Sequence, residues 1–478
     1  MFFGREDMLE QLDSLWRKRV SSLVTCRGRR RIGKSTLIEQ FAKRSGAKFL
    51  KIEGLRPDKT TTNADELAAF ARQLSDQCGC ERTPPIDWSD AFRRLDRELP
   101  EGRKTVVLLD EVSWLAYFYP EFPSYLKIAW DNLFKRHDRL VLVLCGSVSS
   151  WIRDNVIDNS AFMGRRSLDI VMKELPLREC VKFWSAAAER TDPREIFDVL
   201  SVTGGVPRYL EEIDPALSAA ENIRKLAFLP RSVLRVDFDE MFSDVITRRP
   251  VFAGRVLKAL VDGPKTPSEM AQSLGVEKGG NISLALKQLE EAGFVASAAG
   301  RNPETGERIR DRRYRIRDNY TRFYLKCIEP VKEVIDDGSF AFLSLEQFEG
   351  WNVDMGVAFE NLIVNNYREL LCRLNLDRAL ILSASPYSRP LSPKSGRSGV
   401  QVDLLLQTRR SMCLVEIKRR RQIGREVVDE MAEKCKRLAR PSGVSLKTAL
   451  VYEGELSPAV EADGFFDAVI PARALLGL

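Results

Sequence analysis

A loop rich in glycine and arginine near the start of the chain constrains the fold more than any other feature. Residues 28–35 are Gly-Arg-Arg-Arg-Ile-Gly-Lys-Ser, which matches the pattern G-x-x-x-x-G-K-[ST] in full. The apolar stretch 22–26 precedes this loop, and a stretch with helical spacing, 35–43, follows it. A strand, loop and helix in this order turn backbone N–H groups toward a phosphate at the positive end of the helix. The loop therefore predicts a nucleotide-binding α/β domain.

The residues of this loop are expected to bind ATP together with Mg²⁺. Lys34 is expected to reach the β- and γ-phosphates, and the hydroxyl of Ser35 is expected to ligate the metal. The residues predicted to contact the nucleotide here are Gly28, Arg29, Arg30, Arg31, Ile32, Gly33, Lys34, Ser35 and Thr36.

A buried strand that ends in two acidic residues supplies the second half of the site. Residues 105–109 are apolar, and Asp110 and Glu111 follow them. Asp110 is expected in the Mg²⁺ shell, and Glu111 is expected to polarise the attacking water as general base. Ser147 follows the next apolar stretch, 140–145, and has two interpretations. It senses the γ-phosphate or orients water, or it is an ordinary turn serine.

The rest of the N-terminal region alternates between strand and helix patterns. Strands are expected at 22–26, 48–52, 105–109, 140–145 and 168–172. Continuous apolar runs are typical of strands that are covered on both faces, so we predict a parallel sheet between two layers of helices. The later changes of pattern predict four parts: 1–175, a P-loop ATPase core; 176–245, a helical lid; 250–330, three helices and a hairpin; and 340–478, a mixed α/β domain. Residues 386–399 are expected to form a mobile loop.

Composition excludes several classes of function. The chain of 478 residues has a single histidine, which excludes any metal site that needs two. Its nine cysteines lack the spacing of a disulfide framework and are expected to be reduced thiols in a cytoplasmic protein. We expect no export signal and no membrane span, because the apolar runs are far too short. The net charge of +7 permits nucleic-acid binding without requiring it.

Several of these segments together resemble the archaeal-type ATPases of the STAND branch of AAA+-like P-loop NTPases. They are Phe3-Gly4-Arg5-Glu6, the phosphate loop, Asp110-Glu111, Gly146-Ser147 and the segment GGVPRYL at 204–210. The resemblance covers about the first 240 residues. It implies that residues 3–5 lie near the adenine and that Pro207 lies in a lid helix that touches the nucleotide. It also implies a nucleotide-gated switch rather than a fast motor.

The segment after the lid resembles a winged helix-turn-helix. Three short helices are expected at 253–260, 266–274 and 281–292, followed by a hairpin that starts near 293 and returns at 314–316. Seven arginines gather in this hairpin: Arg301, Arg308, Arg310, Arg312, Arg313, Arg315 and Arg317. They suit DNA phosphates without reading the base sequence. The alternative is a packing module whose basic hairpin is only solvated.

A second acidic and basic cluster lies in the C-terminal part. The expected strand 401–406 carries Asp403, and the next strand ends in Glu416-Ile-Lys418. The period of two puts Glu416 and Lys418 on one face. Asp403 and Glu416 are expected to share Mg²⁺ or Mn²⁺, because hard cations bind carboxylate oxygens. Lys418 is expected to orient the attacking water or to stabilise the pentavalent phosphate.

This arrangement resembles the core of PD-(D/E)xK nucleases. That core begins with a helix that carries a Glu, and the segment 356–362 with Glu360 fits it. The resemblance implies a site formed by Glu360, Asp403, Glu416 and Lys418, with the helix 427–438 packed behind the sheet.

Two functions follow from these motifs. The first is an ATP-controlled, metal-dependent DNA endonuclease, for which the resemblance suggests a role in defence against foreign DNA or in a mobile element. The expected partners are DNA, further copies of the chain and a protein activator, and no membrane. The alternative is a nucleotide-gated DNA-binding or signalling ATPase whose nuclease-like domain is inactive.

Overall fold

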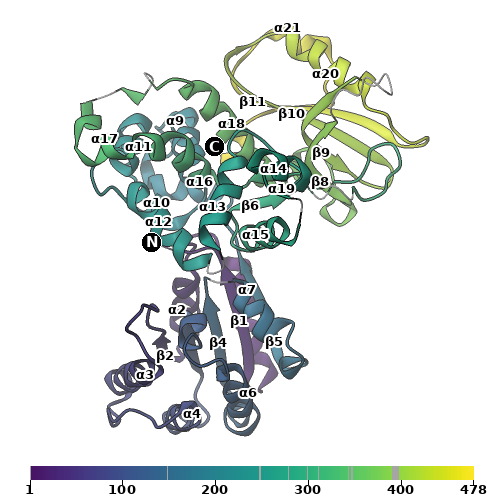
Figure 1. Ribbon diagram of the computed structural model, residues 1–478. Helices are drawn as coiled ribbons and strands as arrows, with labels where there is room; N and C mark the ends of the chain where they lie inside the picture. The colour runs from purple at the N-terminus through teal and green to yellow at the C-terminus, as the bar shows by residue number, and fades with distance from the viewer. Residues whose placement is uncertain are drawn as a thin grey trace. The chain divides into compact units, whose positions relative to one another are not determined.

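The computed structural model describes residues 2–147, 149–246, 249–277, 279–298, 300–309, 312–342, 344–345, 348–389 and 398–478. The chain divides into two compact units (Figure 1). Unit 1 comprises residues 1–174 and 243–247, and unit 2 comprises residues 175–242 and 248–478. The division of the chain into four parts stays a prediction.

Unit 1 is built on a five-stranded sheet with the strand order β2-β3-β4-β1-β5. Every pair of neighbouring strands is parallel. The parallel sheet predicted from the apolar runs is therefore confirmed, and all five strands lie where they are expected. Its elements are α1 (Glu6–Leu15), β1 (Ser22–Gly28), α2 (Lys34–Ser45), β2 (Lys48–Glu53), α3 (Asn63–Cys78), α4 (Trp88–Arg97), β3 (Thr105–Asp110), α5 (Val112–Leu115), α6 (Phe122–Asn132), β4 (Leu140–Gly146), α7 (Ser149–Ile152) and β5 (Arg166–Met172).

The core of unit 1 explains this order of strands. All residues of β3 and β4 are buried, as expected of central parallel strands covered on both faces. Helices α3, α4 and α6 contribute one side of the core, where the rings of Trp88 and Phe122 meet edge to face at 4.7 Å. This packing fixes the carboxyl ends of β1, β3 and β4 side by side, because the three strands are direct neighbours.

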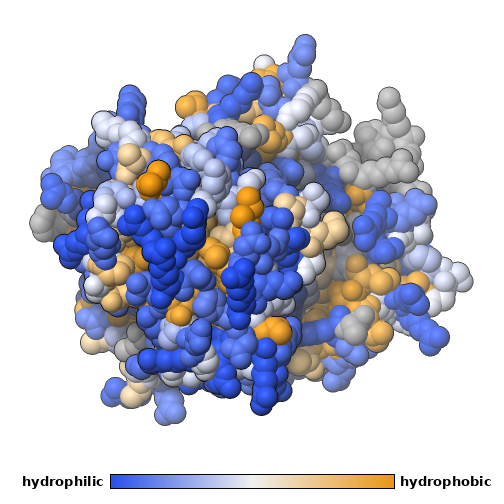
Figure 2. Space-filling model, turned by 90° about the horizontal axis from the view of Figure 1, so that it is seen from below, coloured by the Kyte–Doolittle hydropathy of each residue, from blue (hydrophilic) through white to orange (hydrophobic). Residues whose placement is uncertain are grey.

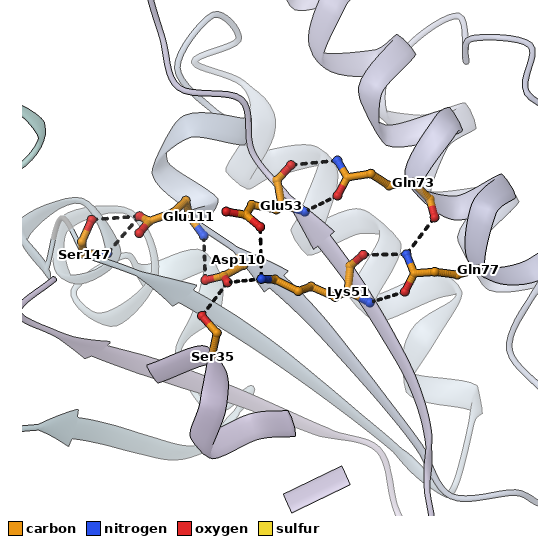
Figure 3. A network of polar contacts seen from close by, with 8 residues as sticks. All are labelled: Ser35, Lys51, Glu53, Gln73, Gln77, Asp110, Glu111 and Ser147. Atoms are coloured by element: carbon orange, nitrogen blue, oxygen red, sulfur yellow. Dashed lines mark hydrogen bonds and ion pairs between the residues drawn. The ribbon is translucent and has the colours of Figure 1, made fainter. Parts of the chain in front are cut away.

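Strand β2 lies at one edge of the sheet, and two glutamines of α3 bind its outer side (Figure 3). The side chain of Gln73 accepts from the N–H of Glu53 (2.8 Å) and donates to its carbonyl oxygen (2.9 Å). Gln77 makes the same pair of bonds with Lys51, at 2.8 Å and 2.7 Å. Since the two glutamines are four residues apart, they lie on one face of the helix.

A buried carboxyl group in α3 makes the stability of unit 1 depend on pH. Glu66 is 1% exposed, and its carboxylate accepts only from the N–H of Leu55, at 3.2 and 3.3 Å, among the described contacts. Burial raises the pKa of Glu66 to about 7, against the weaker opposite effect of the Leu55 bond. A raised pKa means that the folded chain binds this proton more tightly than the unfolded chain. The stability is therefore fully present below about pH 4.5 and is lost as pH rises through about 7.

We expect Glu66→Gln to remove this loss. At pH 8 the variant should be more stable than the original protein by about 2 kcal/mol, or ~4–8 °C in melting temperature, and at pH 5 the two should be similar. Melting temperatures at both pH values measure the effect. Glu39→Gln is the control, because Glu39 is exposed on α2. An equal pH dependence of Glu66→Gln and the original protein would contradict the prediction.

Unit 2 begins with helices and continues with three short helices and a two-stranded antiparallel sheet. The helices predicted for residues 176–245 are present, and so are the three helices and the hairpin predicted for residues 250–330. The principal elements are α8 (Leu177–Cys180), α9 (Pro193–Thr203), α10 (Pro207–Leu210), α11 (Ala219–Ala227), α12 (Val233–Val245), α13 (Pro250–Ala259), α14 (Pro267–Leu274), α15 (Gly280–Glu291), β6 (Val295–Ser297), β7 (Tyr314–Ile316), α16 (Asn319–Phe323) and α17 (Lys332–Asp336).

The C-terminal part of unit 2 contains a mixed five-stranded sheet with the order β12-β11-β10-β9-β8. Strand β9 is antiparallel to β8 and β10, whereas β11 runs parallel to β10 and β12. Helix α20 packs on this sheet through Val427, Val428 and Met431, as predicted. The elements are α18 (Trp351–Asn365), α19 (Tyr367–Arg373), β8 (Ser383–Arg389), β9 (Val400–Gln407), β10 (Ser411–Ile423), α20 (Glu426–Arg437), β11 (Ser445–Leu456), α21 (Pro458–Asp463), β12 (Ala468–Pro471) and α22 (Arg473–Leu476).

The prediction of a mobile loop over 386–399 is wrong at its start. Residues 386–389 belong to strand β8, where Tyr387 pairs with Val402 and Arg389 pairs with Val400 of β9. Pairing with β9 overrides the local preference of a Pro- and Ser-rich stretch, and an edge strand tolerates the proline. Residues 390–397 lie outside the described residues.

No helix among the described residues is long and apolar enough to cross a membrane. On the face seen in Figure 2, hydrophilic side chains cover most of the surface, and hydrophobic ones are scattered among them and gather in one area toward the lower right.

Candidate functional site

The loop between β1 and α2 has a backbone conformation that requires glycine at two positions. Gly33 precedes α2 with a φ of 87°, and Gly28 has a φ of 153°. A Cβ at Gly28 would lie 2.4 Å from the carbonyl oxygen of Met172, so no larger residue fits there. The loop leads directly into the N-terminus of α2, whose free N–H groups and positive dipole suit a phosphate.

Lys34 is folded back onto this loop. Its Nζ donates to the carbonyl oxygens of Gly28 and Arg29, both at 3.2 Å, and the residue is only 6% exposed. Phosphate oxygens are stronger partners for an ammonium group than carbonyl oxygens are. The position suits a lysine that exchanges these two bonds for bonds to a bound phosphate.

The N-terminal segment touches the same loop. Arg5 donates to the carbonyl oxygen of Ile32 at 3.5 Å and to that of Lys173 at 2.7 Å. Arg29 and Ile32 are both buried. The segment that the resemblance assigns to the adenine therefore lies directly against the phosphate loop.

The other residues predicted to bind nucleotide have different surroundings. The guanidinium of Arg30 lies 6.0 Å from the ring centre of Trp114, and Arg31 has a φ of 66°. Thr36 is exposed in the first turn of α2. Pro207 begins α10 in unit 2, and its contact with nucleotide stays a prediction.

The structure brings Ser35 and Asp110 together at the ends of neighbouring elements (Figure 3). The hydroxyl of Ser35 donates to Asp110 Oδ2 at 2.6 Å, and Asp110 is 4% exposed. A hydroxyl and a carboxylate at this separation are the oxygen donors that Mg²⁺ prefers, so the residues fit the predicted metal. A metal bound there would neutralise charge on the β- and γ-phosphates.

Glu111 and Ser147 form the second pair of the site. Glu111 Oε2 accepts from both the N–H (3.1 Å) and the hydroxyl (2.9 Å) of Ser147. Glu111 has a φ of 45°, which is unusual for a residue with a side chain and which costs conformational energy. Ser147 thus fixes the carboxylate that is predicted to act as general base. Its role as a sensor of the γ-phosphate stays a prediction.

Lys51 completes this network, and the sequence did not lead us to predict it (Figure 3). Its Nζ lies 3.2 Å from Asp110 Oδ2 and 3.0 Å from Glu53 Oε2. Burial works to lower the pKa of Lys51, but Asp110 and Glu53 raise it overall. The available signal was the spacing of Lys51 and Glu53, which puts both on one face of β2.

We expect Lys51→Met to destabilise the nucleotide-free protein by about 1–2 kcal/mol, because the buried Asp110 loses its cationic partner. Thermal unfolding without nucleotide measures the loss. Lys51→Arg keeps the cation and is the control. Addition of Mg²⁺ and ATP should reduce the difference, since cationic charge returns to Asp110. Equal stability of Lys51→Met and the original protein without nucleotide would contradict the prediction.

A second cluster of charged side chains lies on the C-terminal sheet. Glu416 of β10 is 1% exposed, and ammonium groups bind both of its oxygens. Lys418 Nζ lies 2.9 Å from Oε1, and Lys434 Nζ of α20 lies 2.6 Å from Oε2. Lys418 also binds Glu430 of α20 at 2.7 Å. Burial alone would lower the pKa of Lys418, but Glu430 and Glu416 raise it.

Asp403 and Glu360 bring further negative charge to this cluster. Asp403 of β9 is 8% exposed and accepts from the N–H of Ile417 at 2.9 Å. Burial, followed by the charge of Glu416, raises the pKa of Asp403 to about 6. Glu360 of α18 is half-buried, and burial together with the charges of Asp403 and Glu416 raises its pKa to about 7. The four residues that the resemblance names therefore act on one another electrostatically.

The fit of this cluster to a divalent cation rests on the chemistry of its donors. Asp403 and Glu416 offer carboxylate oxygens. Burial, followed by the neighbouring carboxylates, raises the pKa of Asp403 and of Glu360, and a bound cation would offset both effects. Within the described ranges, however, no group of three or more Asp, Glu, His or Cys side chains is arranged to hold a metal ion. Lys434, which the sequence did not lead us to expect here, occupies one oxygen of Glu416. Only the tertiary packing of α20 brings it there.

Some arginines of the hairpin segment form ion pairs or hydrogen bonds within the protein, and others are exposed to solvent. Arg313 pairs with Glu269 at 2.6 Å, and Arg301 donates to the carbonyl oxygen of Gly306 at 2.8 Å. Arg308 and Arg312 are exposed. Arg310 lies outside the described residues. The basic hairpin therefore presents fewer arginines to solvent than the sequence suggests.

Comparisons with known proteins assign the N-terminal part. Residues 2–213 match a family model described as an ATPase domain predominantly from Archaea. An uncharacterized protein of Methanocaldococcus jannaschii is 25% identical over 388 residues, which cover 78% of each chain. A Walker-type ATPase of Pyrococcus abyssi has a TM-score of 0.49 at 17% identity, with 68% of this chain and 96% of that chain covered. The ORC2 protein of Aeropyrum pernix has a TM-score of 0.45 at 15% identity, with coverages of 70% and 94%. The family match confirms the predicted ATPase domain.

Proposed function

We propose that the archaeal-type ATPase domain of this protein controls a metal-dependent DNA nuclease in its C-terminal part. The observation that carries the proposal is the cluster of Glu360, Asp403, Glu416 and Lys418, which come from α18, β9 and β10. The charge of Glu416 helps to raise the pKa of Glu360 and of Asp403, and Lys418 pairs with Glu416 at 2.9 Å. Carboxylates and a lysine in this combination suit phosphodiester hydrolysis, in which a metal ion stabilises the charge that develops on phosphorus-bound oxygens. Lys418 would orient the attacking water or stabilise the pentavalent phosphate.

Contacts between the helices after residue 175 and the C-terminal sheet support the control by ATP. Arg419, the residue after Lys418, forms an ion pair with Asp198 of α9. The ring of Phe359, the residue before Glu360, meets Phe197 of α9 edge to face at 5.2 Å. Helix α9 therefore contacts the direct neighbours of two proposed catalytic residues. Since the resemblance makes this region the lid of the ATPase, a movement of the lid would act on both.

The test is incubation of the purified protein with linear, circular and single-stranded DNA. Mg²⁺ or Mn²⁺ is present, with and without ATP. We expect cleavage that depends on the divalent cation and changes with ATP. The proposed partners are DNA, further copies of the chain and a protein activator. The proposed biological role is defence against foreign DNA. Absence of cutting with every substrate and metal would overturn the nuclease.

One observation favours a second candidate function. Two lysines hold Glu416, and the described residues contain no arranged metal site. A nucleotide-gated DNA-binding or signalling ATPase with an inactive nuclease-like domain would have such a cluster. It predicts DNA binding that changes with nucleotide and no cutting under any metal.

A further inference from the structure

Unit 2 contains a cavity of about 350 Å³ next to the proposed nuclease residues. Its walls come from two regions that are distant in the sequence. The connection after α13, β7 and α16 form one side, and α18, β8 and β9 form the other. Glu360 and Asp403 line it. The volume falls within the range of about 300–1,000 Å³ that is typical of sites for small ligands.

The cavity contains a cation whose described hydrogen bonds go to neutral groups. Arg315 of β7 lines it and donates to the side-chain oxygens of Asn361 and Asn365, the latter at 2.8 Å. Burial lowers the pKa of Arg315 to about 10, so the guanidinium stays charged at neutral pH. Amides satisfy its N–H groups without neutralising its charge, and Glu360 in the same wall is a carboxylate that acts on it electrostatically. Of the other arginines in the wall, Arg313 is paired with Glu269, and Arg322 donates to the carbonyl oxygen of Val261 at 2.6 Å.

Apolar and aromatic side chains make up much of the remaining wall. Val357, Val364 and Ile316 line the cavity, and so does Tyr387 of β8. Aliphatic walls and an aromatic ring suit the flat face of a nucleic-acid base, and a guanidinium suits a phosphate. A cavity of this volume is too small for a double helix but suits one nucleotide taken out of its stack.

We propose that this cavity binds one unpaired nucleotide of a single strand. Its phosphate would contact Arg315, and its base would lie against Tyr387 and the aliphatic wall. This inference rests on the proposed nuclease, because it places the neighbouring phosphodiester at Glu360 and Asp403. It also names the substrate: a single strand, or a duplex with a frayed or overhanging end, rather than an intact duplex.

Binding of a short fluorescein-labelled oligothymidylate to the full chain tests the proposal. Fluorescence anisotropy is measured in EDTA, where metal-dependent cleavage cannot proceed. Arg315→Met should weaken binding by about tenfold or more, because a charge-assisted hydrogen bond is lost. Arg368→Met is the control, since Arg368 is exposed on α19, and it should change binding by less than about threefold. Tyr387→Leu should also weaken binding, and it leaves the contacts of Arg315 intact.

The competing ligands are labelled duplex DNA of the same length and a single-stranded RNA. Duplex binding as tight as single-strand binding, or unchanged binding in both Arg315→Met and Tyr387→Leu, would overturn the proposal. Equal binding of RNA would keep it and extend the class to RNA. If no DNA is cut but both substitutions weaken binding, the proposed nuclease fails and the binding site stands. If DNA is cut and both variants bind normally, the binding site fails and the nuclease stands.

Discussion

Substitution of Glu416 by alanine is expected to abolish DNA cleavage and to leave ATP hydrolysis unchanged. Glu416 is the most deeply buried carboxylate of the cluster, and it lies between Lys418 and Lys434. It is also one of the two residues proposed to hold the metal. Loss of a group that stabilises the transition state lowers the rate by about 10²–10³. Cleavage of labelled DNA and release of phosphate from ATP measure the two activities on the same sample.

Two further variants make the Glu416 result interpretable. Glu416→Ala leaves two lysines without their shared partner, so Glu416→Gln, which keeps the size of the side chain, separates loss of charge from loss of packing. Glu433→Ala is the control, because it removes an exposed carboxylate of α20 that pairs with Arg437 at 2.8 Å. It should cut DNA normally. Retained cleavage in both Glu416 variants would remove this cluster from the reaction.

Substitution of Lys34 by alanine is expected to lower ATP hydrolysis by about a hundredfold or more. Lys34 is the side chain at the start of α2 that is folded onto the loop, and it is the lysine predicted to reach the β- and γ-phosphates. ATP should then no longer alter DNA cleavage. Lys43→Ala is the control, because Lys43 is exposed in the last turn of the same helix.

The pair of variants also separates the two activities. Lys34→Ala should keep the metal dependence of cleavage while it loses the response to ATP, and Glu416→Ala should lose cleavage while it keeps ATP hydrolysis. Normal ATP hydrolysis by Lys34→Ala would place the ATPase site elsewhere. Loss of cleavage together with loss of hydrolysis would mean that ATP turnover is required for cutting.

The N-terminal fold could be predicted because its strong signals are local. The apolar runs at 105–109 and 140–145 predict strands that are covered on both faces, and both runs form such strands. The glycines of the phosphate loop fix the turn between β1 and α2. Residues 386–389 show the limit of such signals. Their sequence favours a loop, and only the pairing with β9 makes them a strand.

In the candidate sites, the residues that belong to sequence motifs could be predicted, and the others could not. Ser35 and Asp110 lie 75 positions apart and meet because parallel strands bring their ends together. Lys51 and Lys434 belong to no motif. Each reaches its carboxylate from a neighbouring element, so its position depends on the register of β2 or on the packing of α20. Arg315 is a similar case, since the sequence assigns it to a basic surface and the structure bonds it to two asparagines.

The two glutamines on β2 determine how this sheet can meet another protein chain. An edge strand with free N–H and C=O groups is a template for a strand from a second molecule, and it invites aggregation. Gln73 and Gln77 occupy these groups at Lys51 and Glu53. Copies of this chain therefore cannot join by extending the sheet across these two residues while α3 stays in place. If the protein assembles, other surfaces must mediate the contact. Loss of the two glutamines would expose unpaired backbone N–H and C=O groups of β2, to which a strand of another chain could bind, beside the ATPase site.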